Sequence, residues 1–159
     1  MEHLWSPWRM EYIQGANEDP DGCIFCSIPG RTDDELVLAR GTLAYVVLNK
    51  FPYNPGHLLV VPFRHTADVE DLTADENLEL QSFLQRSVRA LREEAEPHGF
   101  NIGMNLGRVA GAGIPDHVHW HVVPRWGGDT NFTTTIGATR VLPELLAETA
   151  SKLAPRFAE

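Results

Sequence analysis

The sequence has no long run of apolar residues and few basic ones. No stretch approaches the ~18 consecutive apolar residues of a membrane-spanning helix, so we expect no membrane segment. The first residues mix charged and aromatic side chains and lack the apolar segment of a signal peptide, so we expect a cytoplasmic protein. The 13 basic residues are outnumbered by 22 acidic ones, and a net charge of −9 argues against nucleic-acid binding.

Cysteine is also scarce. The only two cysteines, Cys23 and Cys26, form one Cys-x-x-Cys pair. A disulfide is not expected in a reducing compartment, and no thioredoxin-like unit is evident around the pair. A zinc site needs four ligands, so two more would have to come from elsewhere in the chain. The alternative is that both cysteines pack as small apolar side chains.

The regular pattern of apolar residues predicts an α+β domain. The 159 residues are enough for one domain with its own core. We predict strands over 36–39, 43–48, 57–62, 100–106 and 117–124, and a C-terminal helix over 141–153. A capping box at Thr73 and Glu76 opens a long helix that runs to about Glu96. Its predicted buried stripe comprises Leu80, Phe83, Leu84, Val88, Leu91 and Ala95. Antiparallel strands broken by one long helix are typical of the α+β class.

The segment 117–124 carries the strongest functional signal. His117, His119 and His121 alternate with apolar residues, so on a strand their imidazoles should share one face, about 6–7 Å apart. Three of the seven histidines fall within five residues, which favours a site over a solvent-facing strand surface. Two chemistries suit such a row. It could bind a transition metal, or one imidazole could be a nucleophile that its neighbours orient.

A glycine-rich segment, 107–116, leads directly into the histidines and favours the nucleophile. Its glycines, among them Gly111 and Gly113, would let backbone N–H groups approach an anion closely, and phosphate is the usual anion. Such a segment is a weak signal alone but a strong one beside a row of histidines. A histidine nucleophile that acts on a phosphate group is therefore favoured over two alternatives, a three-histidine metalloenzyme and a nucleotide-binding module without activity.

The pattern His-x-His-x-His, with apolar x, resembles the signature of the histidine triad (HIT) superfamily of nucleotide hydrolases and transferases. Other positions that fit the same signature are Asn49, His57, Asn105, Pro124 and Arg125. The resemblance covers about residues 36–130, and the segments 4–10 and 124–132 are most similar to actinobacterial-type diadenosine tetraphosphate phosphorylases of the fragile-histidine-triad-like branch. It implies an antiparallel HIT-like sheet with one long helix and a C-terminal helix. We expect one HIT domain over 1–159, with an N-terminal arm (1–22), a core (36–130) and a C-terminal segment (131–159).

The resemblance also implies a reaction in two steps on an adenine dinucleoside polyphosphate, with no catalytic cofactor. His119 would attack the α-phosphorus and form a covalent nucleotidyl-histidine. His121 would hydrogen-bond the phosphate oxygens, and His57 and the backbone around His117 would orient the central imidazole. A homodimer or a higher homo-oligomer is the expected assembly.

Substrate contacts are implied for four further residues: Asn49, Asn105, Gly111 and Gly113. Asn49 would bind ribose hydroxyls, and the other three would hold phosphate oxygens. In the branch that the chain resembles most, the position four residues before the first histidine of the row carries a Ser or Gln that contacts phosphate. Here it is Gly113, so phosphate and water both stay open as acceptor, giving a phosphorylase or a hydrolase. An adenosine phosphoramidase of the same superfamily is the alternative enzyme.

The resemblance finally supplies the two missing zinc ligands. Zinc-containing HIT proteins begin with a similar Cys-x-x-Cys pair, take one histidine from the end of a Pro-x-x-His segment, and take another from the first position of the row. The matching residues here are His65 and His117. A structural zinc held by Cys23, Cys26, His65 and His117 is therefore expected.

Overall fold

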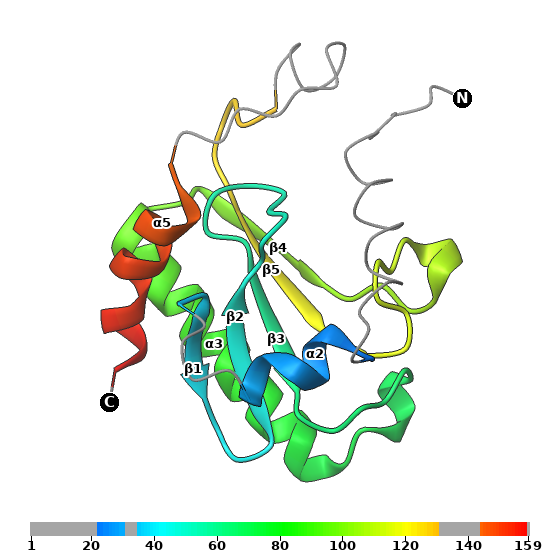
Figure 1. Ribbon diagram of the computed structural model, residues 1–159. Helices are drawn as coiled ribbons and strands as arrows, with labels where there is room; N and C mark the ends of the chain where they lie inside the picture. Colours follow the sequence, from blue (N-terminus) through cyan, green and yellow to red (C-terminus); the bar gives the residue numbers. More distant parts are fainter. Residues whose placement is uncertain (1–21, 31–34, 131–143, 159) are drawn as a thin grey trace, which may run out of the picture.

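The computed structural model describes residues 22–30, 35–130 and 144–158. Its centre is a five-stranded antiparallel sheet in the order β1-β2-β3-β5-β4 (Figure 1). The strands are β1 (Val37–Arg40), β2 (Ala44–Leu48), β3 (Leu58–Pro62), β4 (Gly99–Gly103) and β5 (Trp120–Arg125). The α-helices are α2 (Ile24–Ser27), α3 (Ala74–Ala95) and α5 (Leu146–Leu153), and the short 3-10 helices are η1 (Ile28–Gly30), η2 (Val69–Asp71), η3 (Arg108–Ala110) and η4 (Ala154–Phe157). The predicted α+β class is confirmed.

Strands β2 and β3 are buried along their whole length because both faces of the sheet are covered. Residues Val46 and Val60 pack in a core against α3, and their neighbours Tyr45 and Val61 pack in a second core with Phe25 of α2. Such two-sided burial explains why these strands are almost continuously apolar rather than alternating. The sheet therefore has an α3 face and an α2 face, which Figure 1 shows on opposite sides.

Helix α3 begins as its sequence predicts. Thr73 is the N-cap, its hydroxyl accepts from the Glu76 N–H, and the Glu76 carboxylate accepts from the Thr73 N–H. The helix ends where Glu96 adopts a left-handed conformation, with φ 43°. The predicted stripe is wrong at one position, because Ala95 lies exposed in the last turn beyond the edge of the core.

The predicted strand over 117–124 starts later than expected. Ladder pairing begins at Trp120, opposite Val60, and His117 and His119 precede it. The reason is that β3 ends at Pro62, which has no N–H to donate across to the segment before β5, so the pairing of β3 with β5 stops there. Instead, the Val118 N–H donates to the Thr66 carbonyl at 2.7 Å. The segment from His117 to His119 is thus held by the connection after β3, and only His121 is held by the sheet.

The C-terminal helix is shorter than predicted, because α5 begins at Leu146 and Leu145 is its exposed N-cap, 70% accessible. Helix α5 packs on α3 (Figure 1). The N-terminal arm, the predicted helix residues 141–143 and most of the predicted C-terminal segment before α5 lie outside the described residues. Among the residues that are described, no helix is both long and apolar enough to cross a membrane.

Candidate functional site

Seven aromatic rings form a continuous row on the α2 face of the sheet. The ring centroids are 4.7 Å apart for Tyr53 and His57, 5.1 Å for His57 and His121, 4.9 Å for His121 and His119, 4.7 Å for His119 and Phe25, 5.6 Å for Phe25 and His117, and 5.2 Å for His117 and His65. The alternating apolar residues Val118, Trp120 and Val122 pack toward α3 instead. The predicted separation of the histidines from Trp120 is therefore confirmed, although only His121 lies in β5.

The tautomer of His119 follows from its backbone contact. Its Nδ1–H donates to the His117 carbonyl at 2.8 Å, because a carbonyl oxygen can only accept. Nε2 therefore carries the ring's lone pair. Burial lowers the pKa of His119 below its ordinary value, so the imidazole stays neutral at neutral pH. A neutral imidazole with one fixed N–H and one lone pair is a competent nucleophile.

His57 and His121 form a hydrogen-bonded pair in which His57 donates and His121 accepts. The Tyr53 N–H donates to His57 Nδ1 at 3.0 Å, which makes that nitrogen an acceptor. The proton of His57 is then on Nε2, which lies 2.9 Å from His121 Nδ1. His121 accepts this bond and keeps its own proton on Nε2. The structure thus places His57 against His121 rather than against His119, and leaves His121 with an N–H on the nitrogen that His57 does not contact.

Asn49 lies beside this pair at the end of β2. The sheet register carries it opposite His57, whose carbonyl accepts from the Asn49 N–H at 2.8 Å. Its Nδ2 is 3.2 Å from His57 Nδ1, and its Oδ1 accepts from the Phe51 N–H at 2.9 Å. A carbonyl oxygen has two lone pairs, so Oδ1 can accept one more bond.

The glycine-rich segment folds into the short helix η3 followed by a turn. Gly111 has φ 93°, a left-handed conformation that favours glycine, and its N–H donates to the Arg108 carbonyl at 3.0 Å. The Ala112 N–H donates to the Gly107 carbonyl at 3.2 Å. These two N–H groups are used within the turn. The hypothesis that this segment binds phosphate therefore rests on the backbone of Gly113 and of the residues after it. Asn105 is half-buried between β4 and η3.

Four potential metal ligands meet at the other end of the row. The ligand atoms of Cys23, Cys26, His65 and His117 all lie within 4.8 Å of one another. His117 Nδ1 is 3.4 Å from Cys23 Sγ and 3.6 Å from Cys26 Sγ, and His65 Nδ1 is 3.4 Å from Cys26 Sγ. Zn–S and Zn–N bonds of ~2.3 and ~2.1 Å around a tetrahedral ion would separate S and N by about 3.6 Å. The four residues therefore fit a tetrahedral zinc, and they are the four that the resemblance to zinc-containing HIT proteins implied.

The orientation of His117 supports the same fit. Its Nε2–H donates to the Pro62 carbonyl at 2.9 Å, which leaves the Nδ1 lone pair directed at the thiols. A histidine ligand of a metal commonly donates its other ring N–H to a backbone carbonyl in this way. Desolvation by burial lowers the pKa of His117 to about 4, so its ring is neutral, as a ligand must be. Cys26 is exposed, which disfavours the alternative of two packed apolar cysteines.

Sequence reasoning missed two members of the row. Phe25 of α2 separates His119 from His117, and Tyr53 flanks His57 and lies 5.8 Å from the His121 ring. The position of Phe25 inside Cys-x-x-Cys is a usable signal once that pair is placed near His117. Tyr53 gives no such signal, because its role depends on its backbone N–H.

Two of the basic residues that could supply positive charge for a phosphate group are instead paired with carboxylates. Arg64 is paired with Glu76 and Arg125 with Asp129, both at hydrogen-bond distance. Lys50 and Arg108 are exposed, and Arg140 lies outside the described residues.

Comparison with known proteins finds one matching family. A family model described as "HIT domain" matches residues 31–128. The chain is 48% identical to the AP-4-A phosphorylase of Mycobacterium tuberculosis, strain H37Rv, over 99% of this chain and 85% of that protein. It is 32% identical to the Bacillus subtilis "Protein hit" over 87% of this chain and 96% of that protein. A crystal structure of a Zn-bound histidine triad family protein from Mycobacterium smegmatis superposes with a TM-score of 0.70 at 29% identity, covering 86% of this chain and 94% of the other.

Proposed function

Because the chain belongs to the HIT family, whose domain model matches most of its length, we propose that it transfers the adenylyl group of diadenosine tetraphosphate to an acceptor through a covalent histidine intermediate. The observation that carries the proposal is the pair of fixed tautomers at His119 and His121. One presents a lone pair and the other an N–H, and their rings are 4.9 Å apart. Similarity to an enzyme named AP-4-A phosphorylase supports the substrate.

The first step is attack by His119. Its Nε2 lone pair forms an N–P bond to the α-phosphorus, and the P–O bond to the rest of the polyphosphate breaks, so ATP leaves. The imidazole acquires positive charge, which the hydrogen bond from Nδ1–H to the His117 carbonyl stabilises. The Nε2–H of His121 donates to a phosphate oxygen as negative charge develops on it.

The second step releases the nucleotide. An oxygen of the acceptor attacks the same phosphorus, the N–P bond breaks, and His119 regains its lone pair. Inorganic phosphate as acceptor gives ADP, and water gives AMP. Splitting the displacement in two lowers the barrier of each half. We favour phosphate, because the relative at 48% identity is named a phosphorylase.

Substrate groups are assigned to the residues around the pair. The remaining lone pair of Asn49 Oδ1 accepts a hydrogen bond from a ribose hydroxyl. Asn105 and the backbone near Gly113 hold phosphate oxygens. Gly111 supports this contact by shaping the turn rather than by donating its N–H. His57 acts on His121 and does not touch the reacting phosphorus.

We assign a structural zinc to Cys23, Cys26, His65 and His117, on the S···N distances and the orientation of His117 described above. The ion would supply cross-linking of α2 to the segments that carry the two histidines. His117 connects the proposed zinc ligands to the proposed nucleophile, because its ring faces the thiols while its carbonyl orients His119.

We further propose a homodimer in the cytoplasm. Strand β4 is an edge of the described sheet, and Ile102 on it and Leu106 beyond it are 46% and 41% exposed. An open edge with exposed apolar residues favours pairing with a second copy. A reducing compartment would keep the two ligand thiols free.

The test is product analysis of diadenosine tetraphosphate incubated with and without inorganic phosphate. ATP with ADP is expected when phosphate is present, and a base quench should leave AMP on the wild-type protein, since histidine phosphoramidates survive base better than acid. No covalent AMP, together with turnover that a chelator abolishes, would instead identify a metalloenzyme. Faster cleavage of adenosine phosphoramidate than of the dinucleotide would favour the phosphoramidase.

A further inference from the structure

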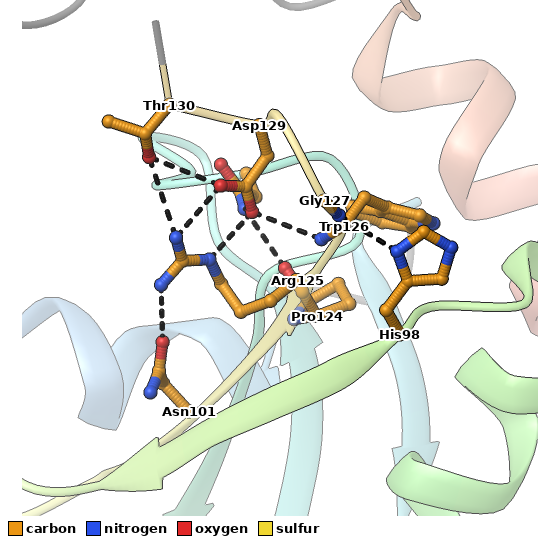
Figure 2. Close-up of polar contacts among 9 residues, drawn as sticks. His98, Asn101, Pro124, Arg125, Trp126, Gly127, Asp129 and Thr130 are labelled. Carbon is orange, nitrogen blue, oxygen red and sulfur yellow. Dashed lines mark hydrogen bonds and ion pairs between the residues drawn. The ribbon is translucent and has the colours of Figure 1, made fainter.

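The loop after β5 contains a carboxylate that lies outside the row of rings but is connected to it. Asp129 accepts from the Arg125 guanidinium at 2.6 and 2.8 Å. It also accepts from the Trp126 N–H and from the Thr130 hydroxyl, each at 3.1 Å (Figure 2). The hydrogen bond from Arg125 holds the pKa of Asp129 well below its usual range, and the side chain is only 11% exposed. The carboxylate therefore stays ionised and can accept hydrogen bonds at neutral pH, and little of it is exposed to solvent.

The same carboxylate fixes a buried asparagine. Asn54, 7% exposed, donates from Nδ2 to Asp129 Oδ2 at 2.8 Å and to the Pro124 carbonyl at 3.0 Å. Its own backbone carbonyl accepts from the His57 N–H at 3.1 Å. Asn54 thus ties the end of β5 to the turn that leads into β3.

That turn sets both the position and the tautomer of His57. The Tyr53 N–H that donates to His57 Nδ1 and the Asn54 carbonyl that accepts from the His57 N–H belong to adjacent residues. A shift of the turn would move both contacts together. His57 Nε2 would then lose its alignment with His121 Nδ1, which is 2.9 Å away.

We infer that Asp129 is a positioning residue for the His57–His121 pair, acting through Asn54 and the turn 53–57. The kinetic part of this inference rests on the proposed function, because it assumes that His121 donates to the substrate. The structural part, which concerns the tautomer of His57, does not depend on any substrate.

A purely stabilising role for the Arg125–Asp129 ion pair is the alternative, and two substitutions separate it from positioning. Asp129→Asn keeps an oxygen that can accept from Asn54 but loses the charge. Asp129→Ala loses both. Positioning predicts that only Asp129→Ala damages catalysis, whereas an ion pair that matters only for stability predicts that both variants unfold more readily and that neither changes kcat below its melting temperature.

The first measurement is steady-state kinetics with diadenosine tetraphosphate and phosphate. Asp129→Ala should lower kcat roughly 10- to 100-fold, the range expected when a catalytic group is misplaced from a distance, with KM within about threefold of wild type. Asp129→Asn should recover most of that kcat. Thr130→Ala is the matched control, because it removes one hydrogen bond to the same carboxylate without touching Asn54, and it should retain wild-type kcat.

The second measurement is the imidazole nitrogen NMR spectrum of the substrate-free protein. His57 should show the Nε2–H tautomer in wild type, Asp129→Asn and Thr130→Ala, and a mixture of tautomers in Asp129→Ala. An unchanged His57 tautomer and an unchanged kcat in folded Asp129→Ala would overturn the inference. If wild type forms no covalent AMP while the tautomer responds as expected, then the proposed function fails and the positioning role stands.

Discussion

His117 and His119 are two residues apart, and each donates one ring N–H to a backbone carbonyl, yet they expose opposite nitrogens. His119 donates from Nδ1 to the His117 carbonyl and keeps its lone pair on Nε2. His117 donates from Nε2 to the Pro62 carbonyl and keeps its lone pair on Nδ1. The His119 ring lies 4.9 Å from the His121 ring, whereas Nδ1 of His117 faces two thiols. The choice of carbonyl therefore divides one row of histidines into two parts, which we propose to be a catalytic region around His119 and a metal-binding region around His117.

Each of these two regions is linked to an arginine–carboxylate ion pair, one through the sequence and the other through hydrogen bonds. Arg64 binds Glu76 through two hydrogen bonds of 2.8 Å, next in sequence to the proposed ligand His65. Arg125 binds Asp129, which is connected to His57 through Asn54. The two pairs have the same chemistry, but only the second is hydrogen-bonded into the catalytic region. If the division is correct, changes in one region should affect turnover and changes in the other should affect stability and metal content.

The largest effect is expected for His119→Ala. Loss of the nucleophile should lower turnover by at least about 10⁴-fold, as for other covalent catalytic groups that act as a unit. Nucleotide affinity measured by calorimetry should change little, because Asn49 and the phosphate contacts remain. Near-normal turnover in this variant would remove the distinction between the two regions.

His121→Ala should be clearly less damaging. A donor to developing charge contributes about 3–4 kcal/mol at most, so kcat should fall by roughly 10²- to 10³-fold. His57→Ala should show the same direction with a smaller loss, and the double variant should lose little more than His121→Ala, because the two residues act through one hydrogen bond. Additive losses measured by single-turnover kinetics would show that His57 acts independently.

Removal of the metal should affect stability more than chemistry. His65→Ala should abolish zinc retention measured by elemental analysis and lower the melting temperature, by about 6–12 °C if the ion contributes about 3 kcal/mol. His117→Ala should do the same, because its proposed role is structural. Turnover of the folded His65→Ala protein should stay within about tenfold of wild type. Zinc-free protein prepared without chelator would count against the metal-binding region.

The smallest effect is expected for Glu76→Gln, the counterpart of the Asp129 variants. The hydrogen bond from Arg64 lowers the pKa of Glu76 to about 2, below its ordinary value of 4.5. Its stabilisation is therefore complete above pH 4.5 and disappears as the pH falls through about 2. The variant should be about 1–2 kcal/mol less stable than wild type at pH 7, and the difference should shrink toward pH 2. Denaturant titration of the two metal-free proteins measures it, and kcat at pH 7 should be unchanged.

Sequence patterning determined most of the architecture. The helix α3 was predicted because Thr73 and Glu76 form a local capping box, whose geometry depends only on residues three apart. Strands β2 and β3 were predicted because long apolar runs must be buried wherever they lie. The start of β5 was wrong by three residues, since it depends on where the partner strand ends, at Pro62.

The local patterns Cys-x-x-Cys and His-x-His-x-His, which have few chemical uses, brought the two cysteines and the row of histidines into view, and the resemblance to HIT proteins added His57 and His65. Only the tertiary structure decided the hydrogen bonds that support the proposed roles. The tautomers of His117 and His119 depend on carbonyls that the fold brings into place, and the link from Asp129 to His57 joins residues 72 positions apart through Asn54. A hydrogen bond is directional and short, so its partner is fixed by the packed chain and not by the order of residues along it.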